Sequence, residues 1–329
     1  MRVAVIGAGS WGTTVAHLAA HNVPTLLWAR RAELADAINQ RHENVDYLGG
    51  YRLHPELRAT SSLEEAAREA DLMVIGVPSH GFRDVLGSLT GHVRPWVPVV
   101  SLTKGLEQGT RMRMSQVVHE LLPGHPVGVL TGPNLAKEIL GGYAAAAVVG
   151  MADEFIATEV QRVFVNDQFR VYFHGDVIGA ELGGVLKNVV AIAAGMAVGL
   201  GAGDNTRAAV ITRGLAEITR LGVAMGGDPM TFAGLAGMGD LIATCISPQS
   251  RNRYVGEQLG RGRRIDEIIA EMNQVAEGVK SCRVALELAD ELGVYMPITA
   301  EVVAVCDEGR TAEEAYRGLL RRQARHEHH

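Results

Sequence analysis

The hydrophobic positions in the first half of the chain follow two alternating patterns. Short apolar runs rich in β-branched residues predict strands at 3–6, 25–28, 72–77, 97–101, 127–130, 145–149 and 169–172. Segments with apolar residues at helical spacing predict helices at 11–21, 33–41, 63–70, 82–89, 111–122 and 153–164. Strands that alternate with helices favour parallel βαβ units in a doubly wound, mostly parallel sheet.

The second half has no comparable strand pattern. From about residue 176 helices alternate with glycine breaks, and we predict helices at 208–221, 254–259, 265–272, 281–292 and 300–307. Between Asp176 and Asp204 only Glu181 and Lys187 are charged, and the glycines in this stretch favour a buried helix over a membrane span. We therefore predict two domains, an α/β domain at 1–180 and an all-α domain at 181–329.

Composition limits the class of protein. The 329 residues are 47% hydrophobic and 21% charged, which is typical of a folded globular protein and excludes a disordered chain. The net charge of -6 does not favour a partner such as nucleic acid or a membrane surface. The three cysteines, Cys245, Cys282 and Cys306, are dispersed, so we expect a reduced, cytoplasmic location and no metal site.

Glycines recur at a fixed spacing after the first predicted strand. Gly7, Gly9 and Gly12 form a GxGxxG pattern that leads into the first predicted helix. In such a unit the first glycine makes a tight turn, the second lets a pyrophosphate approach the backbone, and the third lets helix and strand pack closely. The helix N-terminus offers free N–H groups to the phosphates. This context favours a dinucleotide-binding, Rossmann-like domain over a purely structural glycine turn.

The end of the second predicted strand indicates which dinucleotide is bound. Sites specific for NAD place Asp or Glu about 20 residues beyond the glycines, but here Arg30 and Arg31 follow the strand. A guanidinium makes paired, charge-assisted hydrogen bonds to a phosphate. We therefore predict that NADP(H) is preferred and that NAD(H) is the second cofactor. The alternative is that both arginines are solvated residues at the start of the next helix.

Two lysines are candidates for the chemistry. Lys104 lies in a turn, SLTKG, at the carboxyl end of a predicted strand, where such folds bind ligands. Its ammonium group faces an anionic substrate there, or it is an ordinary surface lysine. Lys187 lies in a helix that is apolar on nearly every face, and burial lowers a lysine pKa toward the working range of a proton donor. The alternative for Lys187 is a side chain that extends along the surface to reach water.

Two further segments supply polar side chains. Asp240 stands between glycines and an apolar run, where it either orients an ammonium group or caps a helix. Arg251 and Asn252 follow in the segment SPQSRNR. A guanidinium beside an amide suits a phosphate group, unless the segment is only a polar turn.

Seven ordered motifs resemble the bacterial-type, NAD(P)-dependent sn-glycerol-3-phosphate dehydrogenase family over nearly the whole chain. They are GAGSWGT at 7–13, SLTKGLE at 101–107, GPNLAKE at 132–138, LKNVVAIAAG at 186–195, GMGDLIAT at 237–244, SRNR at 250–253 and AEGV at 276–279. The resemblance implies an oxidoreductase that reduces dihydroxyacetone phosphate to sn-glycerol 3-phosphate with a hydride from NAD(P)H, feeding glycerophospholipid synthesis. It also implies a homodimer and a phosphorylated small-molecule substrate.

The resemblance also implies roles for individual residues. With the glycines and arginines above, the expected cofactor contacts are Gly7, Gly9, Ser10, Trp11, Gly12, Arg30, Arg31, Lys104, Ala136, Arg251, Val275 and Glu277. The expected substrate contacts are Lys104, Gly132, Asn134, Lys187, Asp240, Ser250, Arg251 and Asn252. Lys187 is the expected proton donor or acceptor, Lys104 would stabilise the developing oxyanion, and Asp240 would hold the lysine head in place.

This chain departs from the family pattern at two positions. Many members have Ser or Thr where this chain has Asn134, and because an amide also donates a hydrogen bond we expect a changed contact without loss of activity. The segment around Tyr47 lacks a proline that is common in the family, so no cofactor role is assigned to Tyr47.

Two other functions are open on the sequence. One is a related dehydrogenase that acts on a 3-hydroxy acid or a sugar acid, and the other is a catalytically silent NADP-binding regulator. The SLTKG turn and the SRN segment favour a phosphorylated ketone over a hydroxy acid. The presence of Lys104, Lys187 and Asp240 disfavours a silent protein. No metal is expected in the site, because the lysines supply the positive charge.

Overall fold

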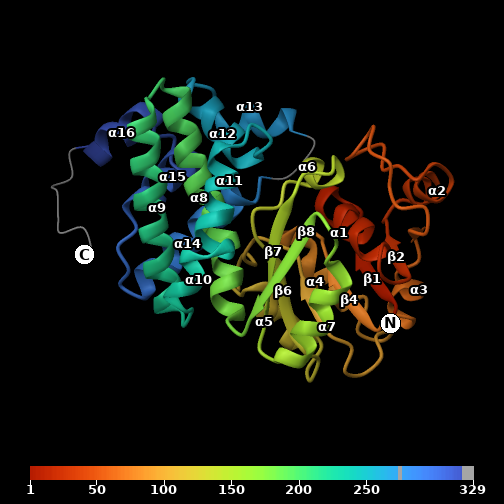
Figure 1. Ribbon diagram of the computed structural model, residues 1–329. Helices are drawn as coiled ribbons and strands as arrows, with labels where there is room; N and C mark the ends of the chain where they lie inside the picture. Colours follow the sequence, from red (N-terminus) through yellow and green to blue (C-terminus); the bar gives the residue numbers. More distant parts are fainter. Residues whose placement is uncertain (273–275, 321–329) are drawn as a thin grey trace.

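A mostly parallel sheet forms one half of the molecule (Figure 1). The structure, a computed structural model, describes residues 1–272 and 276–320. Within them the strand order is β3-β2-β1-β4-β5-β6-β7-β8. The strands are β1 (Val3–Ile6), β2 (Thr25–Trp28), β3 (Arg58–Thr60), β4 (Leu72–Ile75), β5 (Val99–Ser101), β6 (Val127–Thr131), β7 (Ala145–Met151) and β8 (Phe169–His174). The first six in spatial order follow the Rossmann arrangement, and only the pairing of β6 with β7 is antiparallel. The predicted fold class of the N-terminal half is confirmed.

Helices cover the sheet and then form the second half of the molecule (Figure 1). Those interleaved with the strands are α1 (Ser10–Ala20), α2 (Ala32–Arg41), α3 (Leu63–Arg68), α4 (Ser79–Gly87), α5 (Met114–Leu121), α6 (Ala136–Leu140) and α7 (Glu154–Phe164). The second half contains α8 (Val177–Gly199), α9 (Asp204–Ala224), α10 (Pro229–Ala233), the π-helical turn η1 (Leu235–Gly239), α11 (Asp240–Ile246), α12 (Arg251–Gly260), α13 (Ile265–Glu271), α14 (Glu277–Glu291), α15 (Pro297–Asp307) and α16 (Ala312–Leu320). The described part of this half has no strand, as predicted.

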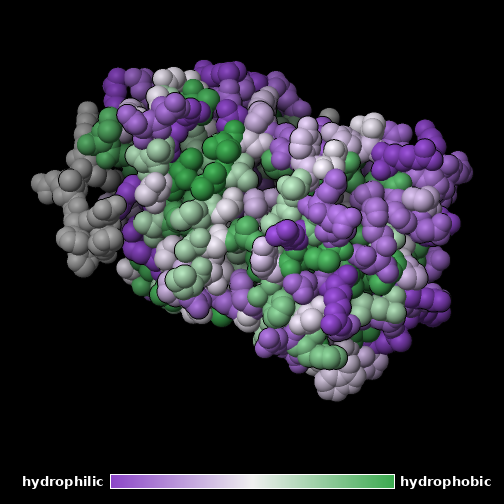
Figure 2. Space-filling view, in the orientation of Figure 1, coloured by the Kyte–Doolittle hydropathy of each residue, from purple (hydrophilic) through white to green (hydrophobic). Residues whose placement is uncertain are grey.

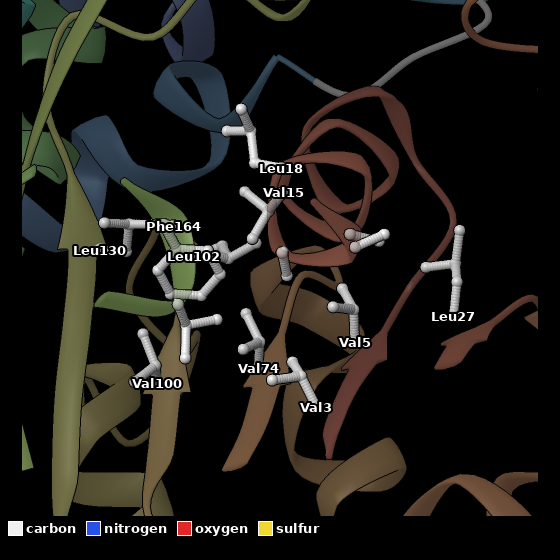
Figure 3. Packing of buried hydrophobic residues seen from close by; sticks show 14 of the residues in the cluster. Val3, Val5, Val15, Leu18, Leu27, Val74, Val100, Leu102, Leu130 and Phe164 are labelled. Carbon is white, nitrogen blue, oxygen red and sulfur yellow. The ribbon is translucent and has the colours of Figure 1, made fainter. Parts of the chain in front are cut away.

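The sheet is buried on both faces, because successive residues of β1 enter different cores. Val3 and Val5 belong to a cluster shared with Val15 and Leu18 of α1, and Figure 3 shows these side chains packed between helix and strands. The intervening residues of β1 belong to the opposite cluster, which includes Phe82 of α4. Continuous apolar strands are typical of parallel sheets that carry helices on both sides.

Helix α8 forms the centre of the helical half and is buried along almost its whole length. By length and composition it could cross a membrane, but 89% of its most apolar window is buried inside the protein, which confirms the predicted interior helix. Its contact with α12 is made through glycines. A Cβ on Gly195 would lie 2.1 Å from the carbonyl oxygen of Arg253, and a Cβ on Gly256 would lie 2.0 Å from that of Ile192. The two backbones therefore touch with no side chain between them.

The sequence pattern missed several short elements. Strand β3 is three residues long at the sheet edge and largely polar, so it lacks the apolar run on which the strand prediction depended. Helices α6, α10, α11 and α16 and the turn η1 also went unpredicted, and most of them are shorter than two turns or interrupted by glycines. Helix α5 begins at Met114, three residues later than expected, because Arg111 has a positive φ of 60° and Arg113 pairs with Leu106 in a bridge.

Candidate active site

Two lysines and one aspartate form a single ionic cluster between the two halves of the molecule. The Asp240 carboxylate accepts a hydrogen bond from Lys187 Nζ at 2.7 Å through Oδ1 and one from Lys104 Nζ at 2.6 Å through Oδ2. Lys187 also donates to the hydroxyl of Thr244, and Lys104 donates to the carbonyl oxygen of Gly132 at 3.1 Å. The structure thus brings together three residues that lie far apart in the sequence.

The environment of Lys187 lowers its pKa. Burial lowers the pKa to about 8, and the nearby charge of Lys104 acts in the same direction, whereas Asp240 partly opposes the shift. Lys187 is 6% exposed and Asp240 is 2% exposed, so their polar contacts come from the protein. Lys187 relies on Asp240 and Thr244, and Asp240 relies on Lys187 and Lys104. A lysine of this kind can exchange a proton near neutral pH, which an exposed lysine does poorly.

The sheet places the cluster at the carboxyl ends of its strands. Lys104 lies in the turn after β5, and Gly132 directly follows β6, so both loops leave the same sheet edge. Gly184 of α8 faces this edge, where an added Cβ would lie 2.9 Å from Thr131 Oγ1 and 3.4 Å from Lys104 Cγ. The absence of a side chain at Gly184 lets α8 approach the sheet, which brings Lys187, less than one turn further along the helix, to the strand ends.

Polar groups without partners lie beside the cluster. The Asn134 amide donates to the carbonyl oxygen of Ala146 at 2.9 Å, but its Oδ1 atom is buried without a hydrogen-bond partner, as is the hydroxyl of Thr131. Buried polar atoms are rarely left unpaired in native proteins. These two oxygens, next to Gly132 and Lys104, are therefore suited to bind a polar ligand.

The segment predicted to bind phosphate lies at the start of α12. Ser250 caps the helix, accepting a hydrogen bond from the backbone N–H of Arg253 at 3.2 Å. Arg251 is exposed as a residue, yet surrounding protein lowers the pKa of its guanidinium, and the Glu277 carboxylate partly offsets that effect. Asn252 is buried in contacts that link helices. Arg251 is therefore accessible as a residue at the start of α12, whereas the amide of Asn252 is buried between helices.

The contacts of Asn252 form a short chain of amide hydrogen bonds. Its Oδ1 accepts from the backbone N–H of Gly278 at 3.0 Å, and its Nδ2 donates to Asn188 Oδ1 at 2.9 Å. The Nδ2 atom of Asn188 then donates to the carbonyl oxygen of Lys104 at 3.2 Å. These hydrogen bonds connect the start of α14, the start of α12 and the Lys104 turn. They therefore link the segment predicted to bind phosphate to the ionic cluster.

The glycine turn has the geometry of a dinucleotide site. Gly7 has φ +119°, and a Cβ there would lie 2.7 Å from the Gly76 carbonyl oxygen, whereas a Cβ on Gly12 would lie 2.0 Å from that of Gly7. A Cβ on Gly9, the N-cap of α1, would meet nothing within 4 Å, so this backbone is open to a ligand. Trp11 in the first turn has a buried Nε1 without a hydrogen-bond partner. These features fit a bound pyrophosphate.

The other residues predicted to contact the cofactor lie in α1, in α6 and in the segment after β2. Ser10 begins α1, and Ala136 begins α6, which packs on α1. Arg30 and Arg31 follow β2 and are exposed, and Arg31 forms an ion pair with Asp46. Val275 lies outside the described residues.

Glu277 joins the two halves of the molecule. At the start of α14, it accepts hydrogen bonds from the backbone N–H of Ser79 at 3.2 Å and from its hydroxyl at 2.6 Å. Ser79 is the first residue of α4, so the carboxylate lies at the N-terminus of that helix. The same carboxylate lies close to Gly105, where an added Cβ would be 2.6 Å from its Oε2 atom.

Sequence reasoning did not single out several residues that contact the predicted site, among them Thr131, Asn188, Ser79 and Thr244. Thr244 had a detectable signal, because it follows Asp240 by four residues and so shares a helix face with it. The contacts of Ser79 and Asn188 join distant segments, and nothing in the local sequence indicates them. No group of three or more His, Cys, Asp or Glu side chains within residues 1–272 and 276–320 is arranged to hold a metal ion.

Comparisons with known proteins agree with this geometry. A family model of the NAD-dependent glycerol-3-phosphate dehydrogenase N-terminus matches residues 2–157, and a model of its C-terminus matches residues 176–317. The chain is 60% identical over 329 residues to glycerol-3-phosphate dehydrogenase (NAD(P)+) of Mycobacterium avium, covering 100% of this chain and 96% of the relative.

Solved structures give the same result. The glycerol-3-phosphate dehydrogenase of Coxiella burnetii superimposes with a TM-score of 0.93 and 34% identity, covering 98% of this chain and 99% of that one. The corresponding enzyme of Saccharomyces cerevisiae superimposes with a TM-score of 0.84 and 29% identity, covering 96% and 98%.

Proposed function

The chain belongs to the NAD-dependent glycerol-3-phosphate dehydrogenase family and is an NAD(P)-dependent oxidoreductase of that class, and we propose that Lys187 is its proton donor. The reaction is the reduction of dihydroxyacetone phosphate to sn-glycerol 3-phosphate, which feeds glycerophospholipid synthesis. NAD(P)H supplies the hydride that reaches C2 of the ketone. The observation that carries the proposal is the Asp240 carboxylate held between the ammonium groups of Lys187 and Lys104.

Lys187 completes the reduction by protonating the substrate. As C2 gains the hydride, negative charge develops on the carbonyl oxygen, and Lys187 gives that oxygen a proton. In the reverse direction the neutral amine of Lys187 removes the proton from the hydroxyl at C2. A pKa of about 8 leaves both forms accessible near neutral pH, which a reversible reaction requires.

Lys104 and Asp240 have different roles in this step. Lys104 places a second positive charge where the oxyanion develops, and this charge stabilises the transition state. Asp240 touches both ammonium groups and keeps them oriented toward one point. Its negative charge also favours the protonated form of Lys187, which offsets part of the cost of burial.

The phosphate of the substrate binds at the start of α12 in this proposal. Arg251 supplies a charged fork there, while Ser250 and Asn252 hold the helix start and its neighbours in place. The unpaired oxygen of Asn134 is suited to accept a hydroxyl of the substrate. Binding energy from the phosphate, remote from the reacting carbon, aligns C2 with the hydride donor.

The test measures oxidation of the nicotinamide through the change in its absorbance. Purified protein is mixed with dihydroxyacetone phosphate and NADPH or NADH in parallel, and the product is identified by its chromatographic match to sn-glycerol 3-phosphate. Rapid oxidation of NADPH or NADH is expected with the phosphorylated ketone. In the reverse assay, no reduction of NADP+ or NAD+ is expected with 3-hydroxy acids. Turnover of a hydroxy acid, or cofactor binding without any turnover, would contradict the proposal.

NADPH is the preferred cofactor in this proposal. Arg30 and Arg31 follow β2, the position at which an NAD-specific site places a carboxylate, and two guanidinium groups suit the 2′-phosphate of NADPH. Similar enzymes are named for both cofactors, so the preference between NADPH and NADH is argued from the residues of this chain. Equal kcat/KM values for NADPH and NADH would rule out this cofactor preference but would leave the dehydrogenase activity as proposed.

A homodimer and a cytoplasmic location complete the proposal. Figure 2 shows apolar side chains gathered over the helical half, and the exposed residues Met238, Ile242 and Ile246 recur at helical spacing along η1 and α11. A contiguous exposed apolar stripe is suited to contact a second copy. Light scattering should give twice the chain mass, and Ile242→Glu should lower the measured mass if α11 is in the interface.

The three cysteines are free and buried, as expected in a reducing compartment.

A further inference from the structure

The arginine expected to bind the 2′-phosphate already has an anionic partner. Arg31 Nη2 donates to Asp46 Oδ2, and the two side chains are 55% and 39% exposed. Arg30 next to it has no ion-pair partner among the described residues. A phosphate that approaches Arg31 therefore meets a guanidinium whose hydrogen-bonding edge is shared with a carboxylate of the same charge sign as the ligand.

Asp46 is held beside the cofactor site by a buried contact. Asn44 is fully buried, and its Nδ2 atom donates to the carbonyl oxygen of Ala8 at 2.9 Å and to Thr13 Oγ1 at 2.8 Å. Ala8 lies within the glycine turn, and Thr13 lies in the first turns of α1. The Asn44 Oδ1 atom also accepts a hydrogen bond from the backbone N–H of Tyr47 at 3.3 Å. The turn that carries Asp46 is thus fastened to the cofactor-binding loop itself.

The rest of this segment is also well packed. Leu48 is fully buried, and Leu53 belongs to the core shared with α1. Glu43 accepts a hydrogen bond from the backbone N–H of Gly50 at 2.6 Å. The backbone N–H of Leu53 donates to the carbonyl oxygen of His42 at 2.7 Å. A segment with these contacts presents Asp46 at a fixed place.

We propose that Asp46 sets the balance between NADPH and NADH by competing with the 2′-phosphate for Arg31. The carboxylate repels the 2′-phosphate and occupies one edge of the guanidinium, so it weakens binding of NADPH. For NADH the same carboxylate is favourable, because it can accept a hydrogen bond from a ribose hydroxyl, as the carboxylate of an NAD-specific site does. The pair therefore makes a site that accepts both cofactors. This inference rests on the proposed use of Arg31 for the 2′-phosphate.

The experiment compares wild type with Asp46→Asn, which keeps the size of the side chain and removes its charge. Calorimetry gives the Kd of NADP+, NAD+ and 2′,5′-ADP for the protein without substrate, and kcat/KM is measured with NADPH and NADH. We expect Asp46→Asn to lower the Kd of NADP+ and of 2′,5′-ADP about tenfold and to change the Kd of NAD+ by less than about threefold, with NAD+ binding no tighter. The ratio of kcat/KM for NADPH over NADH should rise accordingly.

Two variants control for charge. Asp71→Asn removes an exposed carboxylate that is paired with Arg94 at the amino end of β4, and its side chain is 42% exposed, close to that of Asp46. Glu33→Gln removes a carboxylate in the first turn of α2, near Arg31, that has no ion-pair partner among the described residues. Neither should change the ratio of the two Kd values more than about twofold. An equal shift of this ratio in Glu33→Gln would indicate a general effect of local charge and would contradict the proposal.

The sign of the change separates the proposal from its rival. If Asp46 instead orients Arg31 for the phosphate, Asp46→Asn raises the Kd of NADP+, and the proposal is wrong. An unchanged Kd of NADP+ also overturns it. The variant Arg31→Gln tests the proposed cofactor preference separately: it should raise the Kd of NADP+ in either case, and failure to do so would remove Arg31 from the site without reference to Asp46.

Discussion

The proposed catalytic end and the proposed cofactor end of this site hold their charged side chains in opposite environments. At the catalytic end, Lys187 and Asp240 are buried and hold each other in the interior between two halves of the molecule. At the cofactor end, Arg31 and Asp46 form an ion pair that is largely open to water. Buried charges change protonation, whereas exposed charges stay ionised and are screened by salt. The first arrangement suits proton transfer, and the second suits a choice between two ligands that differ by one phosphate.

The two ends also differ in what the backbone contributes. The proposed pyrophosphate site is made of glycines and helix N–H groups, so its geometry follows from main-chain conformation at Gly7 and Gly9. The proposed catalytic cluster is made of side chains from three separate segments and depends on how closely α8 approaches the sheet at Gly184. Variants at the catalytic end should therefore change turnover and its pH dependence, and variants at the cofactor end should change affinity and its salt dependence.

The largest expected effect is that of Lys187→Ala. Loss of a general acid typically lowers kcat about 10²-fold to 10⁴-fold, and a near-normal kcat would remove Lys187 from that role. The matched variant Lys187→Arg keeps a positive charge next to Asp240 but cannot release a proton near neutral pH. It should be nearly as inactive as the alanine variant, while circular dichroism shows both folded. Full activity of Lys187→Arg would indicate that only the charge matters.

The pH dependence should run in opposite directions for the two directions of the reaction. Reduction requires protonated Lys187, so its kcat should be constant below a pH of about 8 and fall about tenfold per unit above it. Oxidation of sn-glycerol 3-phosphate requires the neutral amine, so its kcat should rise up to the same pH and then level off. Stopped-flow measurement of the hydride step gives both profiles. Parallel profiles would mean that another group donates the proton.

Arg251→Ala should raise the KM for dihydroxyacetone phosphate by about tenfold or more, because a charge-assisted contact to the phosphate is lost. The control is Arg261→Ala at the opposite end of α12, where the arginine is exposed and pairs with Glu257. That variant should leave the KM within about twofold of wild type. Steady-state kinetics at saturating NADPH separates KM from kcat, and an unchanged KM in Arg251→Ala would argue against the phosphate assignment.

The smallest expected effect is that of salt on the cofactor end. Raising ionic strength from about 0.05 to 0.5 M should increase the KM for NADPH severalfold, because Arg31 is exposed and its attraction to the 2′-phosphate is screened. The KM for NADH should change less, and the kcat should change little. Chloride and acetate salts are compared to separate screening from specific ion binding. An equal effect on both cofactors would show that the arginines do not distinguish them.

Much of the fold could be predicted from the sequence because local patterns determine it. The strands other than β3 were predicted from short runs rich in apolar and β-branched residues. The glycine turn and the buried helix around Lys187 were predicted from residue spacing. The short edge strand β3 and the glycine-interrupted turn η1 have no such pattern, since tertiary pairing rather than local preference forms them. The domain boundary near residue 180 stays a prediction.

The site was predicted residue by residue but not contact by contact. Spacing and resemblance indicated Lys104, Lys187 and Asp240, yet nothing local indicates that one carboxylate bridges both lysines. The pairing of Glu277 with Ser79 joins residues 198 positions apart, and no periodic pattern reaches that far. The roles of the individual residues stay predictions until the variants above are measured.

The glycine contact between α8 and α12 limits how this enzyme can change over evolutionary time. Lys187 lies on one of these helices and Arg251 begins the other, so the backbone contact fixes the span between the proposed acid and the proposed phosphate anchor. Because no side chain separates the helices, the span cannot shorten, and a larger residue at Gly195 or Gly256 would lengthen it only by forcing the packed backbones apart. A descendant that takes a longer phosphorylated ketone would have to move its anchor to another residue, while these glycines stay in place.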